Sequence, residues 1–384
     1  LNVPLDDNGQ VVTLNKAAED FFRTDTDKAG EKPFADIMGP DNADLMGAIE
    51  KVYATNRAVV DYDVPLVMPW GKEQYVNINF VPLIGHNKER QGLVLAFEDI
   101  TSGKRMQRTL ARYMTKDIAE QILLDPSRRA LGGTRSRATV IFSDIRGYTG
   151  MTEDMSAEDT VSFLNEYFSL MADVIFNNHG VLDKYIGDGI MSVFGVPYVR
   201  EDDAIRAVTT AVEMRERLKA FNQGREKKGK TPIRIGIGIC TGDVISGNIG
   251  SERRMDFTVI GDGVNVASRI ETLTKYYGVD ILMSESTMEV LENCFSTRLV
   301  DQVRAKGKQK PVRIYEVIGT SEQALSPYHT LFCEGVTLYQ KRDFEAAARC
   351  FEKGLDGDPV CRVFLDRCRH FKMFPPDENW DGVW

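Results

Sequence analysis

The chain lacks the sequence features that mark membrane-spanning, secreted and zinc-binding proteins. No run in its 384 residues approaches the roughly 18 apolar residues of a membrane span. Its six cysteines stand at scattered spacings without a Cys-x-x-Cys pair, which argues against zinc sites and disulfide frameworks and predicts reduced thiols in the cytoplasm. The chain opens at Leu1 with neither an initiator Met nor a signal peptide, so we expect a fragment of a longer protein.

Positive charge is also scarce. The chain has 48 Lys and Arg residues against 57 Asp and Glu residues, a formal net charge of -9. Because phosphate backbones attract basic surfaces, this balance argues against nucleic acid as the main partner, although it allows a nucleotide bound by a local cluster. Apolar residues make up 42% of the chain, which is ordinary for globular proteins, and the length predicts two or three domains.

Residues 1–101 alternate short apolar runs with turn signals, which predicts a small antiparallel sheet with helices on one side. Strands are expected at 62–67, 75–83 and 92–97, and a helix at 15–22. The segment resembles a PAS sensor domain. The resemblance is carried by Asp6-Asp7-Asn8-Gly9, Asn15-Lys16-Ala17-Ala18 and Phe97-Glu98-Asp99-Ile100-Thr101.

PAS domains often hold flavin or haem, and this segment offers little for either. No cysteine precedes Cys240, so the thiol that a flavin photoadduct requires is missing. His86 is the one candidate axial haem ligand between residues 1 and 101, and its turn-like neighbourhood favours an exposed loop histidine instead. The signal that the domain senses is therefore left open.

The segment 102–135 is predicted to be a linker helix. Apolar residues recur every three or four positions from Met106 to Ile122, and Asp125-Pro126 ends the pattern. Two interpretations stay open: a short parallel coiled coil with a second copy, and an amphipathic helix that lies on its own domain.

Two carboxylates between residues 139 and 189 point to metal-assisted nucleotide chemistry. Asp144 follows an apolar strand, Asp188 stands at the tip of a hairpin, and a helix-length segment separates them. Two acids held in this way suit a pair of divalent cations on a nucleoside triphosphate. Each alone is more often an ordinary turn residue, so the inference depends on their joint occurrence. The turn after the first acid has backbone N–H groups that can face phosphate oxygens: Arg146, Gly147, Tyr148 and Thr149.

The segment 136–320 resembles the catalytic domain of class III nucleotide cyclases, the adenylyl and guanylyl cyclases. Four motifs carry the resemblance jointly: Phe142-Ser143-Asp144-Ile145-Arg146-Gly147-Tyr148-Thr149, Lys184-Tyr185-Ile186-Gly187-Asp188, Phe257-Thr258-Val259-Ile260-Gly261-Asp262 running into Asn265-Val266-Ala267-Ser268-Arg269, and Lys306-Gly307-Lys308. The segment 321–384 resembles one tetratricopeptide unit followed by a helix, which must pack on something else because a lone unit cannot bury its apolar face.

The sequence thus predicts an α+β protein. Its expected parts are a PAS-like antiparallel sheet domain at 1–101, the linker helix at 102–135, a ferredoxin-like βαββαβ cyclase catalytic domain at 136–320 and a tetratricopeptide-like helical tail at 321–384.

The resemblance implies a role for each motif. Asp144 and Asp188, with the backbone carbonyl of Ile145, would hold two Mg2+ ions, for which Mn2+ can substitute. Lys184 would donate to an adenine ring nitrogen, and Thr258 would accept from the exocyclic amine. Guanine presents the opposite pattern at those atoms, so these two residues favour ATP over GTP.

The remaining implied residues act on the ribose and the phosphates. Asn265 would orient the ribose, and Arg269 would stabilise charge growing on the α-phosphoryl oxygens. Lys306 would contact a phosphate, although neighbouring Lys308 fits as well. Most adenine-specific members carry Asp where this chain has Thr258, a departure found in a bacterial-type subgroup often stimulated by bicarbonate, which makes bicarbonate a candidate activator.

In this family each active site combines the metal acids of one subunit with the base-selecting and charge-stabilising residues of the other. One chain holds both sets here, so the resemblance implies a homodimer with two equivalent sites. The expected activity is adenylyl cyclase, which converts ATP to 3',5'-cyclic AMP and pyrophosphate under control of the sensor domain. Two alternatives are a guanylyl cyclase and a non-catalytic cyclase-like signalling module.

Overall fold

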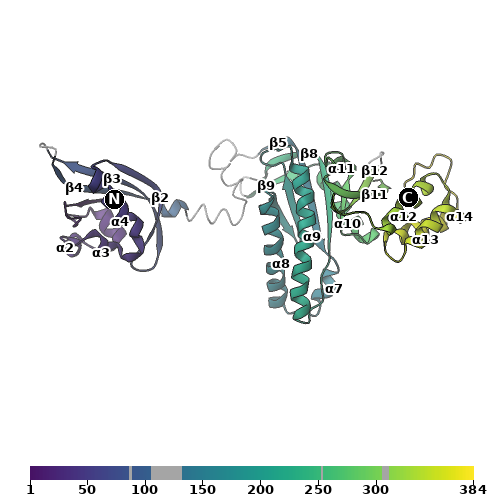
Figure 1. The fold of residues 1–384 in the computed structure, drawn as a ribbon, viewed down its shortest axis with the longest axis horizontal. Helices are drawn as coiled ribbons and strands as arrows, with labels where there is room; N and C mark the ends of the chain where they lie inside the picture. Colours follow the sequence, from purple (N-terminus) through teal and green to yellow (C-terminus); the bar gives the residue numbers. More distant parts are fainter. Residues whose placement is uncertain (86–88, 105–131, 252–253, 305–310) are drawn as a thin grey trace. The chain divides into compact units, whose positions relative to one another are not determined.

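The computed structural model describes residues 1–85, 89–104, 132–251, 254–304 and 311–384 (Figure 1). The chain divides into two compact units, Leu1–Tyr113 and Met114–Trp384. None of the helices in the described ranges is long and apolar enough to cross a membrane. The predictions made for His86, Lys306, Lys308 and most of the linker 102–135 lie outside the described residues.

The first unit is a four-stranded antiparallel sheet with short helices, as the sequence predicted. The strands follow the order β1-β4-β3-β2. Their bounds are β1 Asn2–Leu5, β2 Val59–Val67, β3 Glu73–Ile84 and β4 Arg90–Asp99. The helices between β1 and β2 are α1 Lys16–Phe22, α2 Thr26–Ala29, α3 Phe34–Met38, the 3-10 turn η1 Pro40–Asn42 and α4 Ala43–Thr55.

Aromatic rings connect the helices to the sheet in the core of this unit. Asn15 caps α1 by accepting a hydrogen bond from the N–H of Ala18 at 3.0 Å, which fixes where the helix begins. The ring of Phe22 then meets the rings of Phe34 and Phe97 edge-on, at centroid distances of 5.9 and 5.5 Å. Helices and sheet therefore share one continuous core, as the PAS-like pattern requires.

The second unit is built on a larger mixed sheet. Its strand order is β11-β12-β10-β8-β5-β7-β6, and β9 pairs with β8. Only the β10–β8 pairing is parallel among the described strands. The strands are β5 Gly132–Ile145, β6 Val181–Ile186, β7 Gly189–Phe194, β8 Ile235–Ser251, β9 Arg254–Ile260, β10 Ile281–Ser284, β11 Phe295–Val303 and β12 Val312–Thr320.

Helices cover both faces of this sheet (Figure 1). The alternation of side chains along β5 sends Ile141 toward α8 and α9, and Val140 toward α10 on the other face. The run β5-α8-β6-β7-α9-β8 has the spatial order of a ferredoxin-like βαββαβ core. The helices are α7 Tyr148–Thr152, α8 Ala157–Asn177, α9 Asp203–Lys227, α10 Asp262–Tyr277 and α11 Glu285–Met288.

The glycine-rich run from Gly236 to Gly250 lies within one long strand. Its sequence, which begins Gly236-Ile237-Gly238-Ile239-Cys240-Thr241-Gly242-Asp243, predicts a strand followed by a turn. That prediction is wrong at the turn, because β8 continues through the run, paired with β5 along its length and with β9 near its end. Glycine at 238 allows α10 to approach β8 closely, because a Cβ there would lie 2.1 Å from the backbone nitrogen of Glu271 on α10. Glycine therefore lets α10 pack tightly on β8.

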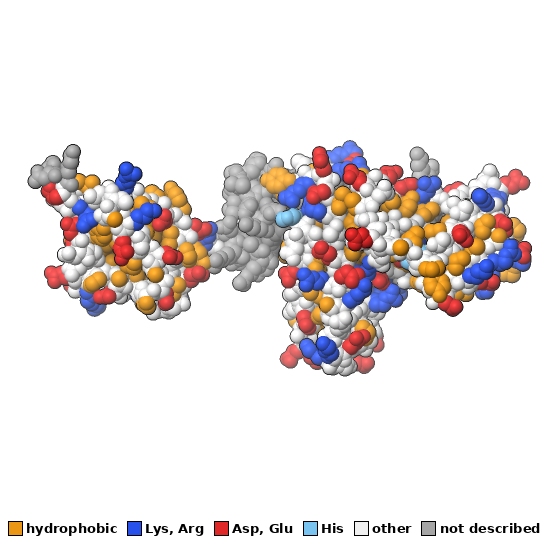
Figure 2. Space-filling model, in the orientation of Figure 1, with side chains coloured by type: hydrophobic (Ala, Val, Ile, Leu, Met, Phe, Trp, Pro, Cys, Tyr) orange, Lys and Arg blue, Asp and Glu red, His pale blue; other side chains and the backbone are white. Residues whose placement is uncertain are grey.

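The C-terminal residues form three helices, α12 Pro327–Gln340, α13 Phe344–Gly354 and α14 Val360–Met373. Their apolar faces join the same core as β12 and α10, with Phe332, Phe351 and Phe364 packed in one cluster with Ile314 and Ile270. The expected packing partner of the tail is thus the sheet domain itself. On the face drawn in Figure 2, acidic and basic side chains are interspersed over both units.

Candidate active site

The two predicted metal acids lie next to each other. Asp144 is the penultimate residue of β5, and Asp188 lies in the two-residue turn between β6 and β7, directly before β7, which pairs with β5. The backbone N–H of Ile145 donates to a carboxylate oxygen of Asp188 at 3.3 Å. Burial and the charge of Asp188 raise the pKa of Asp144 to about 6. Two carboxylates held this close are an unfavourable pair unless a cation lies between them.

The donor set fits a hard divalent cation. Among the described residues, no group of three or more His, Cys, Asp or Glu residues is placed to hold a metal. Mg2+ commonly takes only one or two carboxylates and completes its shell with water and substrate phosphates. Asp144, Asp188 and the carbonyl of Ile145 offer oxygen ligands of that kind.

Arg146 follows Asp144 and Ile145, and its side chain points into the domain, away from the predicted phosphate-facing turn. Its backbone N–H donates to the carbonyl of Arg234 at 2.8 Å. Its guanidinium lies over Gly236 and approaches the carboxylate of Glu271 on α10 at 3.6 Å. Burial raises the pKa of Glu271 to about 7, against the opposing effect of Arg146. The ion pair therefore links the end of β5 to α10.

The other three residues of the predicted phosphate-facing turn begin a short helix. Gly147 takes a left-handed conformation with φ 68°, and Tyr148 and Thr149 open α7. The first N–H groups of a helix have no carbonyl acceptor within it. The first N–H groups of α7 therefore lie directly after the acid pair, while the Arg146 N–H is bonded to the carbonyl of Arg234.

The two predicted base-selecting residues lie together on β6 and β9. A third residue, Asp183, connects them: the hydroxyl of Thr258 donates to its carboxylate at 3.0 Å, and the ammonium of Lys184 lies 3.3 Å from the same oxygen. Burial raises the pKa of Asp183, and its bonds to Thr258 and Lys184 oppose that shift. Sequence reasoning missed Asp183; its position beside Lys184 is the only sequence signal for it.

Asn265 and Arg269 share the exposed face of α10, as their spacing predicted. The buried face of the helix carries Val266, Ala267 and Ile270. Because successive helical residues are rotated by about 100°, Arg269 points roughly opposite to Glu271, which faces Arg146. Arg269 is therefore directed away from the acid pair of its own chain.

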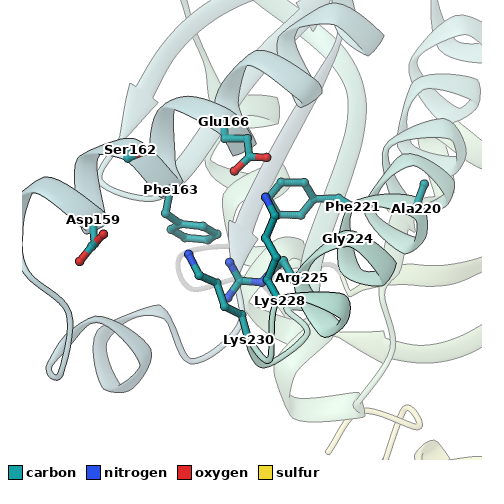
Figure 3. A pocket seen from close by; sticks show the side chains of 10 residues that line it. All are labelled: Asp159, Ser162, Phe163, Glu166, Ala220, Phe221, Gly224, Arg225, Lys228 and Lys230. Carbon is teal, nitrogen blue, oxygen red and sulfur yellow. The ribbon is translucent and has the colours of Figure 1, made fainter.

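A cavity of about 230 Å³ lies between α8 and the end of α9 (Figure 3). Figure 3 shows Lys228 and Lys230 among the side chains that line it, and the guanidinium of Arg225 lies 4.8 Å from the centre of the Phe163 ring. Arg225 also reaches the sulfur of Met151 on α7 at 3.8 Å. None of the predicted site residues lines the cavity. Its walls brace α7, which follows the acid pair.

Comparison with known proteins agrees with this geometry. Residues 133–319 match the family model of the adenylate and guanylate cyclase catalytic domain, and residues 3–105 match that of the PAS fold. Residues 133–319 form an adenylate and guanylate cyclase catalytic domain. This domain carries an N-terminal PAS fold and a C-terminal helical region.

Several cyclases are similar to this chain. The adenylate cyclase of Anabaena cylindrica is 45% identical over 188 residues, which are 47% of this chain and 36% of that protein. Adenylate cyclase 1 of Rhizobium meliloti is 31% identical over 211 residues, 55% of this chain and 32% of that protein. A bacterial light-regulated adenylyl cyclase of known structure shares the fold, with a TM-score of 0.51 and 24% identity over 59% of this chain and 64% of that one. The chain thus spans about a third of these two curated relatives.

Proposed function

We propose that this chain is an adenylyl cyclase that converts ATP to 3',5'-cyclic AMP and pyrophosphate. One observation carries the proposal: within a cyclase fold, the close pair Asp144 and Asp188 occurs together with Lys184 and Thr258 placed side by side on β6 and β9. The first pair suits metal-bound phosphates and the second suits adenine. The names of the Anabaena and Rhizobium relatives support the same activity.

Asp144, Asp188 and the Ile145 carbonyl would hold two Mg2+ ions per site, with Mn2+ as a substitute. Bound divalent cations supply Lewis acidity that activates the ribose 3'-hydroxyl and neutralises the triphosphate. Arg269 stabilises negative charge on the α-phosphoryl oxygens, and Asn265 orients the ribose. The N–H groups that open α7 receive phosphate oxygens, and Lys306 or Lys308 adds a positive charge.

Hydrogen-bond polarity selects the base. Adenine carries an acceptor at N1 and an amine at C6, whereas guanine carries an N1 donor and a C6 carbonyl. The Lys184 ammonium can only donate, so it matches N1 of adenine. The Thr258 oxygen accepts from the C6 amine.

The active site is composite and requires a homodimer. Arg269 lies on the opposite side of α10 from Glu271, which faces Arg146 beside the acid pair, and this supports a site completed by a second copy. Large apolar side chains are exposed on β6 and β9, which carry the base-selecting residues, and on β8, which pairs with β9. They favour a face that a partner covers. They are Tyr185, Ile186, Ile245, Met255 and Ile260.

Regulation by the PAS domain is proposed to act through the linker 102–135, by changing the angle between the two catalytic domains. Bicarbonate is a candidate activator because Thr258 replaces the more usual Asp. Activity measured with sodium bicarbonate and with sodium chloride at matched pH and ionic strength tests it: equal rates remove bicarbonate from the proposal.

Product identity tests the central proposal. Purified protein is incubated separately with ATP and GTP in the presence of Mg2+ or Mn2+, and the products are identified by mass. We expect cyclic AMP from ATP, and we expect Asp144→Ala to abolish it while the dimer persists in size-exclusion chromatography. Cyclic GTP as the main product would assign a guanylyl cyclase, and no product from either nucleotide would assign a non-catalytic module.

A further inference from the structure

Asp183 touches both base-selecting side chains but has no assigned role. Its side chain is 2% exposed, and Thr258 as a whole is 8% exposed. One carboxylate oxygen accepts the hydroxyl proton of Thr258 at 3.0 Å and lies 3.3 Å from the Lys184 ammonium. The contact with Thr258 joins residues 75 positions apart in the chain, so the pairing of β6 and β9 with the rest of the sheet creates it.

This contact decides what the threonine can recognise. A hydroxyl has one proton and two lone pairs, so a freely rotating threonine can accept from an amine or donate to a carbonyl. Such a residue would not distinguish the C6 amine of adenine from the C6 carbonyl of guanine. An ionised carboxylate has no proton to give, so the bond to Asp183 engages the only hydrogen of Thr258. The oxygen that remains can only accept.

We propose that Asp183 is a positioning residue that holds the hydroxyl proton of Thr258 and thereby makes this cyclase selective for the C6 amine of adenine. The inference deepens the proposed adenylyl cyclase activity and rests on it. The Thr258 oxygen then only accepts hydrogen bonds from the base, as a carboxylate would, although the Asp183 carboxylate itself is buried behind Thr258. The C6 carbonyl of GTP would meet an oxygen with no proton to offer.

The same carboxylate serves both specificity contacts. Burial raises the pKa of Asp183, and the hydroxyl of Thr258 and the positive charge of Lys184 oppose that shift by favouring the ionised form, which is the form that can only accept. The shared oxygen also limits where the two side chains can move. Lysine then presents a donor and threonine an acceptor at a fixed separation, which is the pattern of N1 and the C6 amine of adenine.

Asp183→Asn tests the inference because the amide has nearly the shape of the carboxylate and can donate to Thr258, which frees the hydroxyl proton to turn toward the base. We expect the ratio of kcat/KM for ATP to that for GTP to fall about tenfold. The ratio should fall mainly because kcat/KM for GTP rises. A merely structural defect would not raise kcat/KM for either nucleotide. Asp173→Asn, at an exposed acid on α8, is the matched control and should leave the ratio unchanged.

A double substitution tests whether the effect passes through Thr258. Thr258→Val removes the hydroxyl, so adding Asp183→Asn to it should cause no further loss of selectivity. A further tenfold loss would overturn the inference, since the carboxylate would then act directly or through Lys184. An unchanged ratio in the single Asp183→Asn variant would overturn it as well.

A substrate analogue keeps the test decisive if Asp183→Asn does not fold. Purine riboside triphosphate retains the N1 acceptor for Lys184 and lacks only the C6 amine. We expect the wild-type protein to use it about tenfold less well than ATP, because the oxygen of Thr258 loses its donor. Equal use would overturn the inference. Failure of the proposed function is distinct from all of these outcomes, because the wild-type protein would then form no cyclic AMP.

Discussion

Arg298 on β11 forms a two-pronged ion pair with Asp358, the residue just before Pro359 and α14, and both side chains are fully buried. Glu316 on β12 accepts from the same guanidinium at 2.7 Å. Nearby, Arg367 on α14 pairs with Asp301 on β11 at 2.6 Å, again with both side chains buried. The C-terminal helices are therefore bonded to the sheet domain through its interior.

Asp358→Ala should destabilise the second unit by about 3 kcal/mol, because it leaves the Arg298 guanidinium buried with one partner fewer. The measurement is thermal or denaturant unfolding followed by a signal from this unit. Asp356→Ala is the matched control: this acid is exposed two residues earlier, and its loss should have almost no effect. If the two variants had the same free energy of unfolding, the buried Arg298–Asp358 pair would add nothing to stability.

The composite site makes a prediction about mixtures of inactive proteins. Asp144→Ala removes a metal ligand, and Arg269→Ala removes the charge-stabilising residue, so each homodimer should be inactive. A dimer with one copy of each contains one site in which both residues are intact. Random exchange in an equal mixture should restore about a quarter of the wild-type rate, since half of the dimers are mixed and half of their sites work.

Co-expression with two different affinity tags lets the mixed dimer be isolated and assayed directly. A mixture as inactive as its components, despite proven subunit exchange, would place Asp144 and Arg269 in the same chain's site. Mixing two preparations of Asp144→Ala is the control, and it should remain inactive.

Local patterns were sufficient to predict the acid pair. Asp144 and Asp188 each end an apolar segment, and the short β6–β7 hairpin returns the chain to β5, so their proximity follows from strand and turn signals close in sequence. The segment between the two acids was long enough for a helix, and α8 lies there. Features that depend on residues close together in the chain could thus be predicted from the sequence.

Features created by distant segments were not visible. Asp183 reads as an ordinary strand acid until β9 brings Thr258 to it, and Arg298 gives no sign of Asp358 sixty positions later. The length of β8 was missed because glycine weakens a strand signal, whereas pairing with β5 on one side and β9 on the other sustains the strand. In each case the deciding contact is non-local.

Gly236→Ala should displace Arg146 and thereby disturb Asp144 and Asp188. A Cβ there would lie 2.0 Å from a terminal nitrogen of Arg146 and 2.3 Å from the hydroxyl of Thr274, so the guanidinium must leave its place beside Glu271. Because Arg146 directly follows Asp144 and Ile145, its displacement should shift the metal ligands, and we expect turnover to fall at least about tenfold. The strained packing should also lower stability by about 1–3 kcal/mol.

Gly224→Ala is the matched control for that substitution. Gly224 lies in α9, and a Cβ there meets nothing within 4 Å, so alanine should preserve turnover and slightly raise the melting temperature. Rates of cyclic AMP formation and melting temperatures are compared for both variants against the wild-type protein. If Gly236→Ala kept full activity, the Arg146–Glu271 pair would have no part in holding the acids in place, and the end of β5 would be positioned by its pairing with β7 and β8 alone.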